Sequence, residues 1–131
     1  MSYITNIVKE TEKNKNFRTV LFTGKKSQLV VMDIPPKGEI GEETHHNVEQ
    51  TLFFLSGRGK AVLDGIETAV GEGDVVVVTP GTKHNFINTG ETSLKVYTIY
   101  APANHIEGRT HKTKADADKD VEDEAFGEAV K

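Results

Sequence analysis

The stretch GDVVVVTPGTKHNFIN at residues 73–88 decides the fold of this chain, together with GEIGEETHHNVEQTLFFLSG at residues 38–57. Both stretches join short runs of β-branched and aromatic residues to turns that contain glycine or proline, a pattern typical of antiparallel strands. The same rhythm extends over residues 17–101 and predicts about eight to ten short strands, which favours a sandwich or barrel over alternating strand–helix units. We therefore predict an all-β fold.

Turn and strand signals divide this region further. Asp64-Gly65 predicts a two-residue hairpin, because a type I′ turn needs positive φ at both central residues. The four valines at residues 75–78 predict a strand that is buried on both faces. The segment at residues 2–8 alternates apolar and polar side chains, so we expect it to add a strand to the sheet of a second copy. A homodimer is therefore expected.

Length and charge limit the class of protein. A chain of 131 residues is enough for one ordinary domain. Residues 112–131 carry seven acidic and four basic side chains with weak apolar periodicity, which predicts an acidic tail that is partly helical or disordered. We therefore divide the chain into a β-barrel with an N-terminal arm at residues 1–111 and this tail at residues 112–131.

Composition argues against several functions. Cysteine is absent, so disulfides and thiolate metal ligands do not occur. A net charge of −4 does not favour nucleic acid or an anionic membrane as a partner. The N-terminus lacks the apolar segment of a secretory signal, and no apolar run is long enough to span a bilayer. We expect a soluble, cytoplasmic protein with a small-molecule ligand.

Four polar side chains are spaced so that they can converge on one point. Residues two apart on a strand share a face, so Glu43 and His45 lie side by side. Gln50 opens the next apolar strand, and His84 begins another strand after the turn at residues 80–81. A carboxylate, two imidazoles and an amide oxygen, without sulfur, suit one divalent transition metal: Fe²⁺, Mn²⁺, Ni²⁺, Co²⁺ or Zn²⁺.

At these positions the chain resembles a single-domain cupin of the RmlC-like superfamily, whose two motifs are roughly G(X)5HXH(X)3–4E(X)6G and G(X)5PXG(X)2H(X)3N. The second motif is met at four positions: Gly73, Gly81, His84 and Asn88. In the first, His45 and Gly57 match, while Glu43 replaces the first histidine and Gln50 replaces the glutamate. The resemblance implies a small antiparallel barrel, the double-stranded β-helix or jelly roll, with a metal held by Glu43, His45, Gln50 and His84.

The two replacements compensate each other. Glu43 adds one carboxylate and Gln50 removes one, so the number of anionic ligands is unchanged and a metal would keep a similar Lewis acidity. A glutamine ligand resembles the small cupins that process unsaturated uronates, although these have histidine where this chain has Glu43. The mixed set is also similar to the mannose-6-phosphate isomerase branch, with carboxylate and amide exchanged.

These features lead to three functional hypotheses. The first is a metal-dependent isomerase or lyase for a small sugar-like hydroxy-carbonyl compound, in which Glu43 or Glu49 acts as the base if it is not a ligand. The second is an iron or manganese dioxygenase with an apolar pocket. The third is a barrel that binds or senses a small molecule without turnover. A metal-free barrel whose polar mouth is vestigial is the alternative to all three. The pocket residues predicted for these hypotheses are Leu52, Phe54, Phe86 and Tyr97.

Strand phase places other residues away from the site. His46 and Glu49 are out of phase with His45 and Gln50, so we expect them at the rim unless a bulge exchanges Glu49 with Gln50.

Two further pairs are less constrained. Tyr97 and Tyr100 have opposite strand parity, so at most one of them faces the cavity. His105 and His111 follow the last predicted strand without any partner spacing, and we expect both to face solvent.

Overall fold

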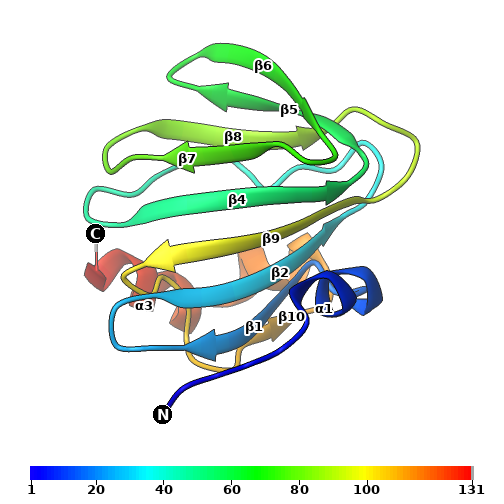
Figure 1. Ribbon diagram of the computed structural model, residues 1–131. Helices are drawn as coiled ribbons and strands as arrows, with labels where there is room; N and C mark the ends of the chain where they lie inside the picture. The colour runs from blue at the N-terminus through cyan, green and yellow to red at the C-terminus, as the bar shows by residue number, and fades with distance from the viewer. Residues whose placement is uncertain (131) are drawn as a thin grey trace.

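The computed structural model describes residues 1–130 as two antiparallel β-sheets around one core, with short helices near both ends of the chain (Figure 1). The elements are α1 (Ile7–Lys13), β1 (Arg18–Thr23), β2 (Gln28–Ile34), β3 (Glu43–Thr44), β4 (Glu49–Ser56), β5 (Arg58–Leu63), β6 (Ile66–Gly71), β7 (Val75–Val78), β8 (Lys83–Asn88), β9 (Leu94–Ala101), β10 (Thr110–His111), α2 (Lys114–Lys119) and α3 (Val121–Val130). None of these helices is long and apolar enough to cross a membrane.

The two sheets have different sizes. The larger has the strand order β10-β1-β2-β9-β4-β7, and the smaller has the order β3-β8-β5-β6. Paired strands run antiparallel throughout both sheets. The predicted all-β jelly-roll architecture is confirmed.

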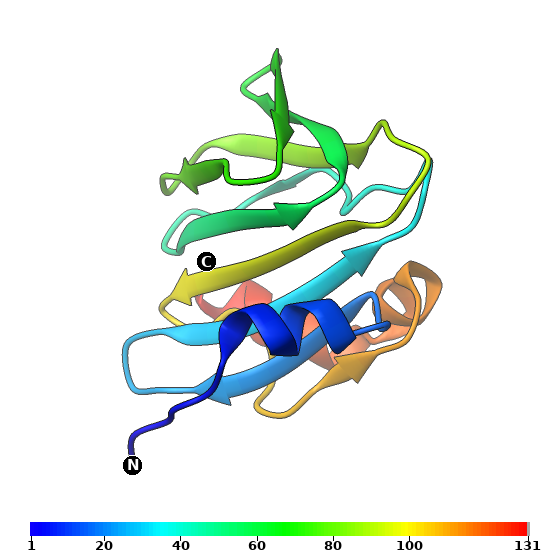
Figure 2. The same cartoon turned by 45° about the vertical axis from the view of Figure 1, so that its right-hand side comes forward.

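Strand alternation produces the core. On β2, Val30, Met32 and Ile34 point inward and are fully buried, and they meet Phe86 of the smaller sheet in one apolar cluster. Val31 points to the opposite face of β2 but is also buried, at 1% exposure. Helix α1 contacts β2 and β9, and it lies on that outer face of the larger sheet (Figure 2).

The turn between β5 and β6 has the predicted form. Asp64 and Gly65 have φ of 48° and 83°, so both central residues lie in the left-handed region as a type I′ turn requires. The hairpin extends to the outer edge of the smaller sheet, and the first four residues of β6 are exposed.

Two local predictions are wrong. The strand expected at residues 2–8 is not present, because helix α1 begins at Ile7. The side chain of Asn6 accepts a hydrogen bond from Lys9 N–H and caps that helix. The valine strand β7 is buried on one face only: Val75 and Val77 are 54% and 52% exposed, because β7 is the edge strand of the larger sheet.

The acidic tail forms two helices, α2 and α3, that lie on the opposite side of the larger sheet from α1 (Figures 1 and 2). Thr113 caps α2 through a hydrogen bond from Asp116 N–H, and Asp120 accepts one from Asp123 N–H at the start of α3. Asp123 is only 5% exposed, so polar side chains rather than a large apolar face attach this segment.

Candidate functional site

The four predicted ligands come from three strands and one adjoining loop. Glu43 on β3 is the register partner of His84 on β8, and His45 follows β3 directly. Gln50 lies on β4 of the larger sheet. His45, Gln50 and His84 are each 3% exposed, so three of the four side chains are buried at the inner face.

Three of these side chains are close together. His45 Nε2 lies 3.2 Å from Glu43 Oε2, and the rings of His45 and His84 have centroids 5.1 Å apart. The Glu43 side chain is 34% exposed, so it connects the buried histidines to open space.

A turn fixes the two ligand-bearing segments against each other. Gly81 has φ of +88°, a conformation that favours glycine, and its N–H donates to the carbonyl of His45 at 2.7 Å. The backbone at His45 is therefore tied to the turn that leads into His84.

Hydrogen bonds also set which atoms of the ligands remain available. His84 Nδ1 lies 2.8 Å from the carbonyl oxygen of Thr82, which can only accept, so Nδ1 carries the proton and neutral His84 has its lone pair on Nε2. The hydroxyl of Thr98 donates to the carbonyl of Thr51 and accepts from the Gln50 amide nitrogen at 3.2 Å. The Gln50 carbonyl oxygen is not used in that bond.

The donor set therefore fits a divalent transition metal. It combines imidazole nitrogen with carboxylate and amide oxygen, and His84 is in the tautomer of a metal ligand, with its other nitrogen donating to a backbone carbonyl. Glu43, His45, Gln50 and His84 are the residues that would hold the ion.

Two neighbouring residues lie outside this group. Gln50 is buried and Glu49 is exposed, so at this point of β4 it is the glutamine that faces the interior. His46 is also exposed. The geometry does not bring Glu49, which we predicted as a candidate base, to the other three side chains.

The predicted pocket residues lie in the core or on the outer face. Leu52, Phe54 and Phe86 are at most 2% exposed, and the Phe86 ring lies 6.2 Å from that of His84. Tyr97 stacks on Phe53 at a centroid distance of 4.9 Å, on the face of β9 opposite to buried Tyr100. Phe86 therefore supports the base of the site, while Tyr97 faces away from it.

A cavity of about 780 Å³ lies beside the candidate ligands and includes Glu43 in its lining. The residues around it come from the start of β1, the loop into β3, the segment after β9 and the two C-terminal helices. Its lining contains seven acidic side chains, and the only basic ones are Arg18 and Lys114. The four predicted pocket residues are not among them.

The sequence analysis did not identify a second buried polar group beside the cavity. His105 is 7% exposed and His111 is 3% exposed, so the expectation that both face solvent is wrong. His105 Nδ1 lies 2.7 Å from Asp123 Oδ2, and its Nε2 lies 3.3 Å from the hydroxyl of Tyr100. Tyr100 is the inward-facing member of the tyrosine pair.

Burial and charge shift the pKa values of this group. Burial, with the positive charge of Arg18, lowers the pKa of His105 to about 4 despite the neighbouring carboxylate of Asp123. Burial also raises the pKa of Tyr100 to about 12. Burial acts to raise the pKa of Asp123, but the hydrogen bonds from His105 and Ile106 and the charge of Arg18 together hold it below its usual value.

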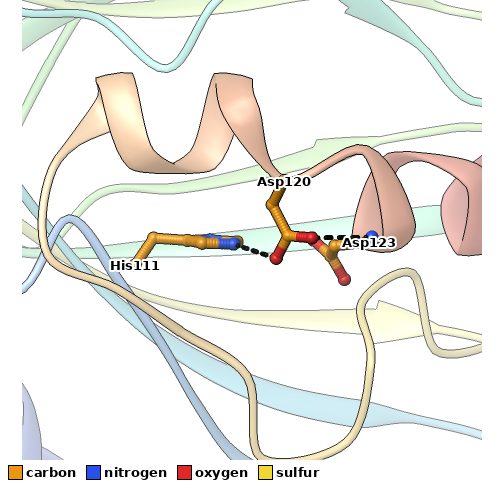
Figure 3. A group of neighbouring side chains, drawn as sticks. All are labelled: His111, Asp120 and Asp123. Carbon is orange, nitrogen blue, oxygen red and sulfur yellow. Dashed lines mark hydrogen bonds and ion pairs between the residues drawn. The ribbon is translucent and has the colours of Figure 1, made fainter.

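Figure 3 shows a third cluster, His111, Asp120 and Asp123, whose nitrogen and oxygen atoms lie within 4.8 Å of one another. These atoms already form hydrogen bonds and ion pairs within the protein. His111 Nδ1 faces the guanidinium of Arg18, which can only donate, so its proton is on Nε2, 2.9 Å from Asp120 Oδ2. Asp120 also pairs with Arg109 at 3.3 Å. The cluster attaches α3 to the barrel and leaves His111 without a free lone pair for a metal.

Comparison with known proteins agrees with this architecture. The family model for the Cupin domain matches residues 30–100, so the chain belongs to the cupin family. A Bacillus subtilis (strain 168) protein named "Uncharacterized protein YrkC" is 43% identical over 121 residues, which cover 88% of this chain and 65% of YrkC. The chain thus spans about two thirds of the length of that relative.

Solved structures are similar over comparable lengths. The crystal structure of BH2720 from Bacillus halodurans has a TM-score of 0.88 and 36% identity, covering 89% of this chain and 93% of BH2720. A predicted oxalate decarboxylase from Thermotoga maritima has a TM-score of 0.62 and 23% identity, covering 66% of this chain and 79% of that one. At this lower identity the likeness concerns the fold alone.

Proposed function

We propose that this cupin binds one divalent transition metal through Glu43, His45, Gln50 and His84, and that it acts on a small hydroxy-carbonyl metabolite as an isomerase or lyase. One observation carries the proposal. Glu43 belongs both to the ligand group, at 3.2 Å from His45 Nε2, and to the lining of the cavity of about 780 Å³. A small molecule in that cavity would therefore meet Glu43, the one candidate ligand in its lining.

The lining supports a polar and uncharged substrate. A cavity of this volume can hold a small metabolite. The excess of carboxylates over basic groups disfavours a phosphorylated or dicarboxylic substrate, because like charges repel. Hydroxyl groups can instead donate hydrogen bonds to these carboxylates.

The chemistry would be divided between the ion and the side chains. A bound divalent ion supplies Lewis acidity toward a carbonyl or hydroxyl oxygen. Glu43 is the carboxylate placed to take up a proton from the substrate if it is not occupied as a ligand, since Glu49 is exposed and outside the cavity lining. The buried histidines hold their rings side by side through packing and, for His84, through the bond to Thr82.

The polar lining argues against the dioxygenase alternative in the form we predicted. That alternative needs an apolar pocket, but Leu52, Phe54 and Phe86 are packed in the core and are not part of the cavity lining.

The test measures metal content in protein purified without an affinity tag. We expect about one equivalent of transition metal in the wild type and its loss in His45→Ala and Gln50→Ala. His46→Ala is the matched control, because this histidine is adjacent in sequence but exposed. A wild-type protein that takes up none of Fe²⁺, Mn²⁺, Co²⁺, Ni²⁺ and Zn²⁺ contradicts the proposal.

Substrate class is tested on the loaded protein. Neutral aldoses and ketoses are compared with their phosphates by NMR, and we expect conversion of the neutral compounds. Binding without conversion would indicate the sensing role instead.

A further inference from the structure

A line of buried polar contacts connects helix α3 to the candidate ligand His45. Asp123 Oδ2 on α3 contacts His105 Nδ1 at 2.7 Å, and His105 Nε2 contacts the Tyr100 hydroxyl at 3.3 Å. The Tyr100 ring then meets His45 edge-on, with centroids 6.4 Å apart and an interplanar angle of 84°. All four residues are at most 7% exposed, so water does not replace these contacts.

The direction of each hydrogen bond in this line is determined. Asp123 is ionised and accepts, so the Nδ1 of neutral His105 donates and its Nε2 accepts. The Tyr100 hydroxyl must therefore donate to His105. The positive charge of Arg18 also acts on the phenol and opposes the effect of burial on the pKa of Tyr100. The bond to His105 uses the proton of the Tyr100 hydroxyl, and it anchors the ring at its hydroxyl end.

Tyr100 is next to two of the four candidate ligands. It is the register partner of Gln50 across β4 and β9, so the two side chains are neighbours on the inner face. Its ring also forms one wall against His45. A change in the orientation of Tyr100 would therefore move or loosen both ligands.

We propose that Asp123 and His105 fix Tyr100 as the wall that positions His45 and Gln50, so that the C-terminal helix α3 determines how well the site holds a metal. These three are positioning residues, because they act through the ligands and not on the ion. The inference rests on the proposed function, since it concerns the same metal site. It assigns a role to the acidic tail, whose helices also form one wall of the cavity.

The line orients side chains and does not transfer a proton. The pKa of Tyr100 is about 12 and that of His105 is about 4, so the proton between them stays on the phenol.

Replacing Asp123 by asparagine tests the line while keeping its shape. The asparagine amide can donate to His105 Nδ1, which moves the imidazole proton to Nε2 and makes His105 donate toward Tyr100. The Tyr100 proton would then lose His105 as its acceptor, because His105 Nε2 would itself carry a proton. Tyr100→Phe removes the hydroxyl and keeps the ring, and it therefore separates anchoring from packing.

The experiment is a titration with Co²⁺, read by visible absorption and by calorimetry, on wild type, Asp123→Asn, Tyr100→Phe and Glu122→Gln. Glu122→Gln is the matched control, because it neutralises an adjacent but exposed carboxylate on α3. We expect both test variants to bind Co²⁺ about 10-fold more weakly with an altered absorption spectrum, and the control to match the wild type.

The outcomes separate the two proposals. If the wild type binds neither Co²⁺ nor any of Fe²⁺, Mn²⁺, Ni²⁺ and Zn²⁺, the metal site is refuted and the positioning role with it. If the wild type binds but both test variants match Glu122→Gln in affinity and spectrum, the positioning role is refuted and the metal site stands. A purely structural role for α3 would lower the melting temperature and leave the spectrum unchanged. If Asp123→Asn does not fold, Tyr100→Phe decides the question.

Discussion

Replacing His105 by glutamine should make the stability of this protein less sensitive to mild acid. His105 is neutral in the folded protein because its pKa is lowered to about 4 from 6.5. Between these two values the unfolded chain binds the proton and the folded protein does not, so the free energy of unfolding falls as the pH falls. The part of the free energy of unfolding that depends on a neutral His105 is therefore fully present above pH 6.5, and it is lost as the pH falls from 6.5 to 4.

The size of the effect follows from the pKa difference. At 1.36 kcal/mol per pKa unit, the full loss is about 3 kcal/mol, of which about 2 kcal/mol falls between pH 7 and pH 4.5. The groups that act on His105 are Asp123, Arg18 and Glu43. Asp123 adds little in this window, because its own pKa is held below 3.8 and its contribution is lost at lower pH.

Urea unfolding followed by circular dichroism at several pH values between 7 and 4.5 measures this slope. His105→Gln should lower stability at pH 7 but lose about 2 kcal/mol less than the wild type on acidification. His46→Gln is the control, because that side chain is exposed and should leave the wild-type slope unchanged. Equal slopes in wild type and His105→Gln would refute a neutral, buried His105.

Three further predictions follow from packing and edges. Gly59→Ala should destabilise the fold by about 3 kcal/mol or more, because an added Cβ would lie 2.5 Å from the carbonyl oxygen of Ile87. At Gly65 an added Cβ meets no atom within 4 Å, so Gly65→Ala should cost only about 1 kcal/mol for its positive φ. Urea unfolding of the two variants compares these losses, and equal losses would contradict the predicted clash at Gly59. Phe86→Ala should lower the free energy of unfolding by about 4 kcal/mol and weaken Co²⁺ binding, because the buried Phe86 ring packs near His84. An unchanged Co²⁺ affinity would show that the packing of Phe86 does not support the site. Light scattering should give twice the chain mass of 14.4 kDa, and Val77→Lys on the exposed edge strand should give the monomer; a wild-type monomer contradicts the predicted homodimer.

The strand pattern could be predicted because it depends on local chemistry. The strand rhythm expected over residues 17–101 includes β2, and Asp64-Gly65 forms the expected turn, since alternation and turn residues act over a few positions. The buried or exposed state of β7 could not be predicted in this way. A run of four valines is compatible with a central strand and with an edge strand, and the exposure of its side chains depends on the strand order of the sheet.

The site, too, could be predicted only where it depends on residues that are close in the sequence. The phase of residues 43–45 predicted a common face for Glu43 and His45, and the resemblance to the cupin motif added Gln50 to them. The side chains of His45 and Gln50 are both buried at the interior. The neighbours of His105 could not be predicted, because Asp123 is 18 residues away and reaches it only when the tail packs on the barrel. A short-range alternation at residues 2–8 was misleading, since the cap at Asn6 favoured a helix instead.

The exposed hairpin strand β6 has a consequence for the internal motions of the molecule. Its first four residues bury little surface, and within the described residues 1–130 it pairs with β5 alone. Local opening therefore needs little free energy there, and amide hydrogens at residues 66–69 should exchange with deuterium well before those of β8. Glu43 lies on β3 at the opposite edge of the same sheet and His84 on the next strand, β8, with β5 between β8 and β6. One strand, β5, thus lies between this edge and the ligand-bearing strand β8, so β6 can open and close while β5 and β8 stay paired.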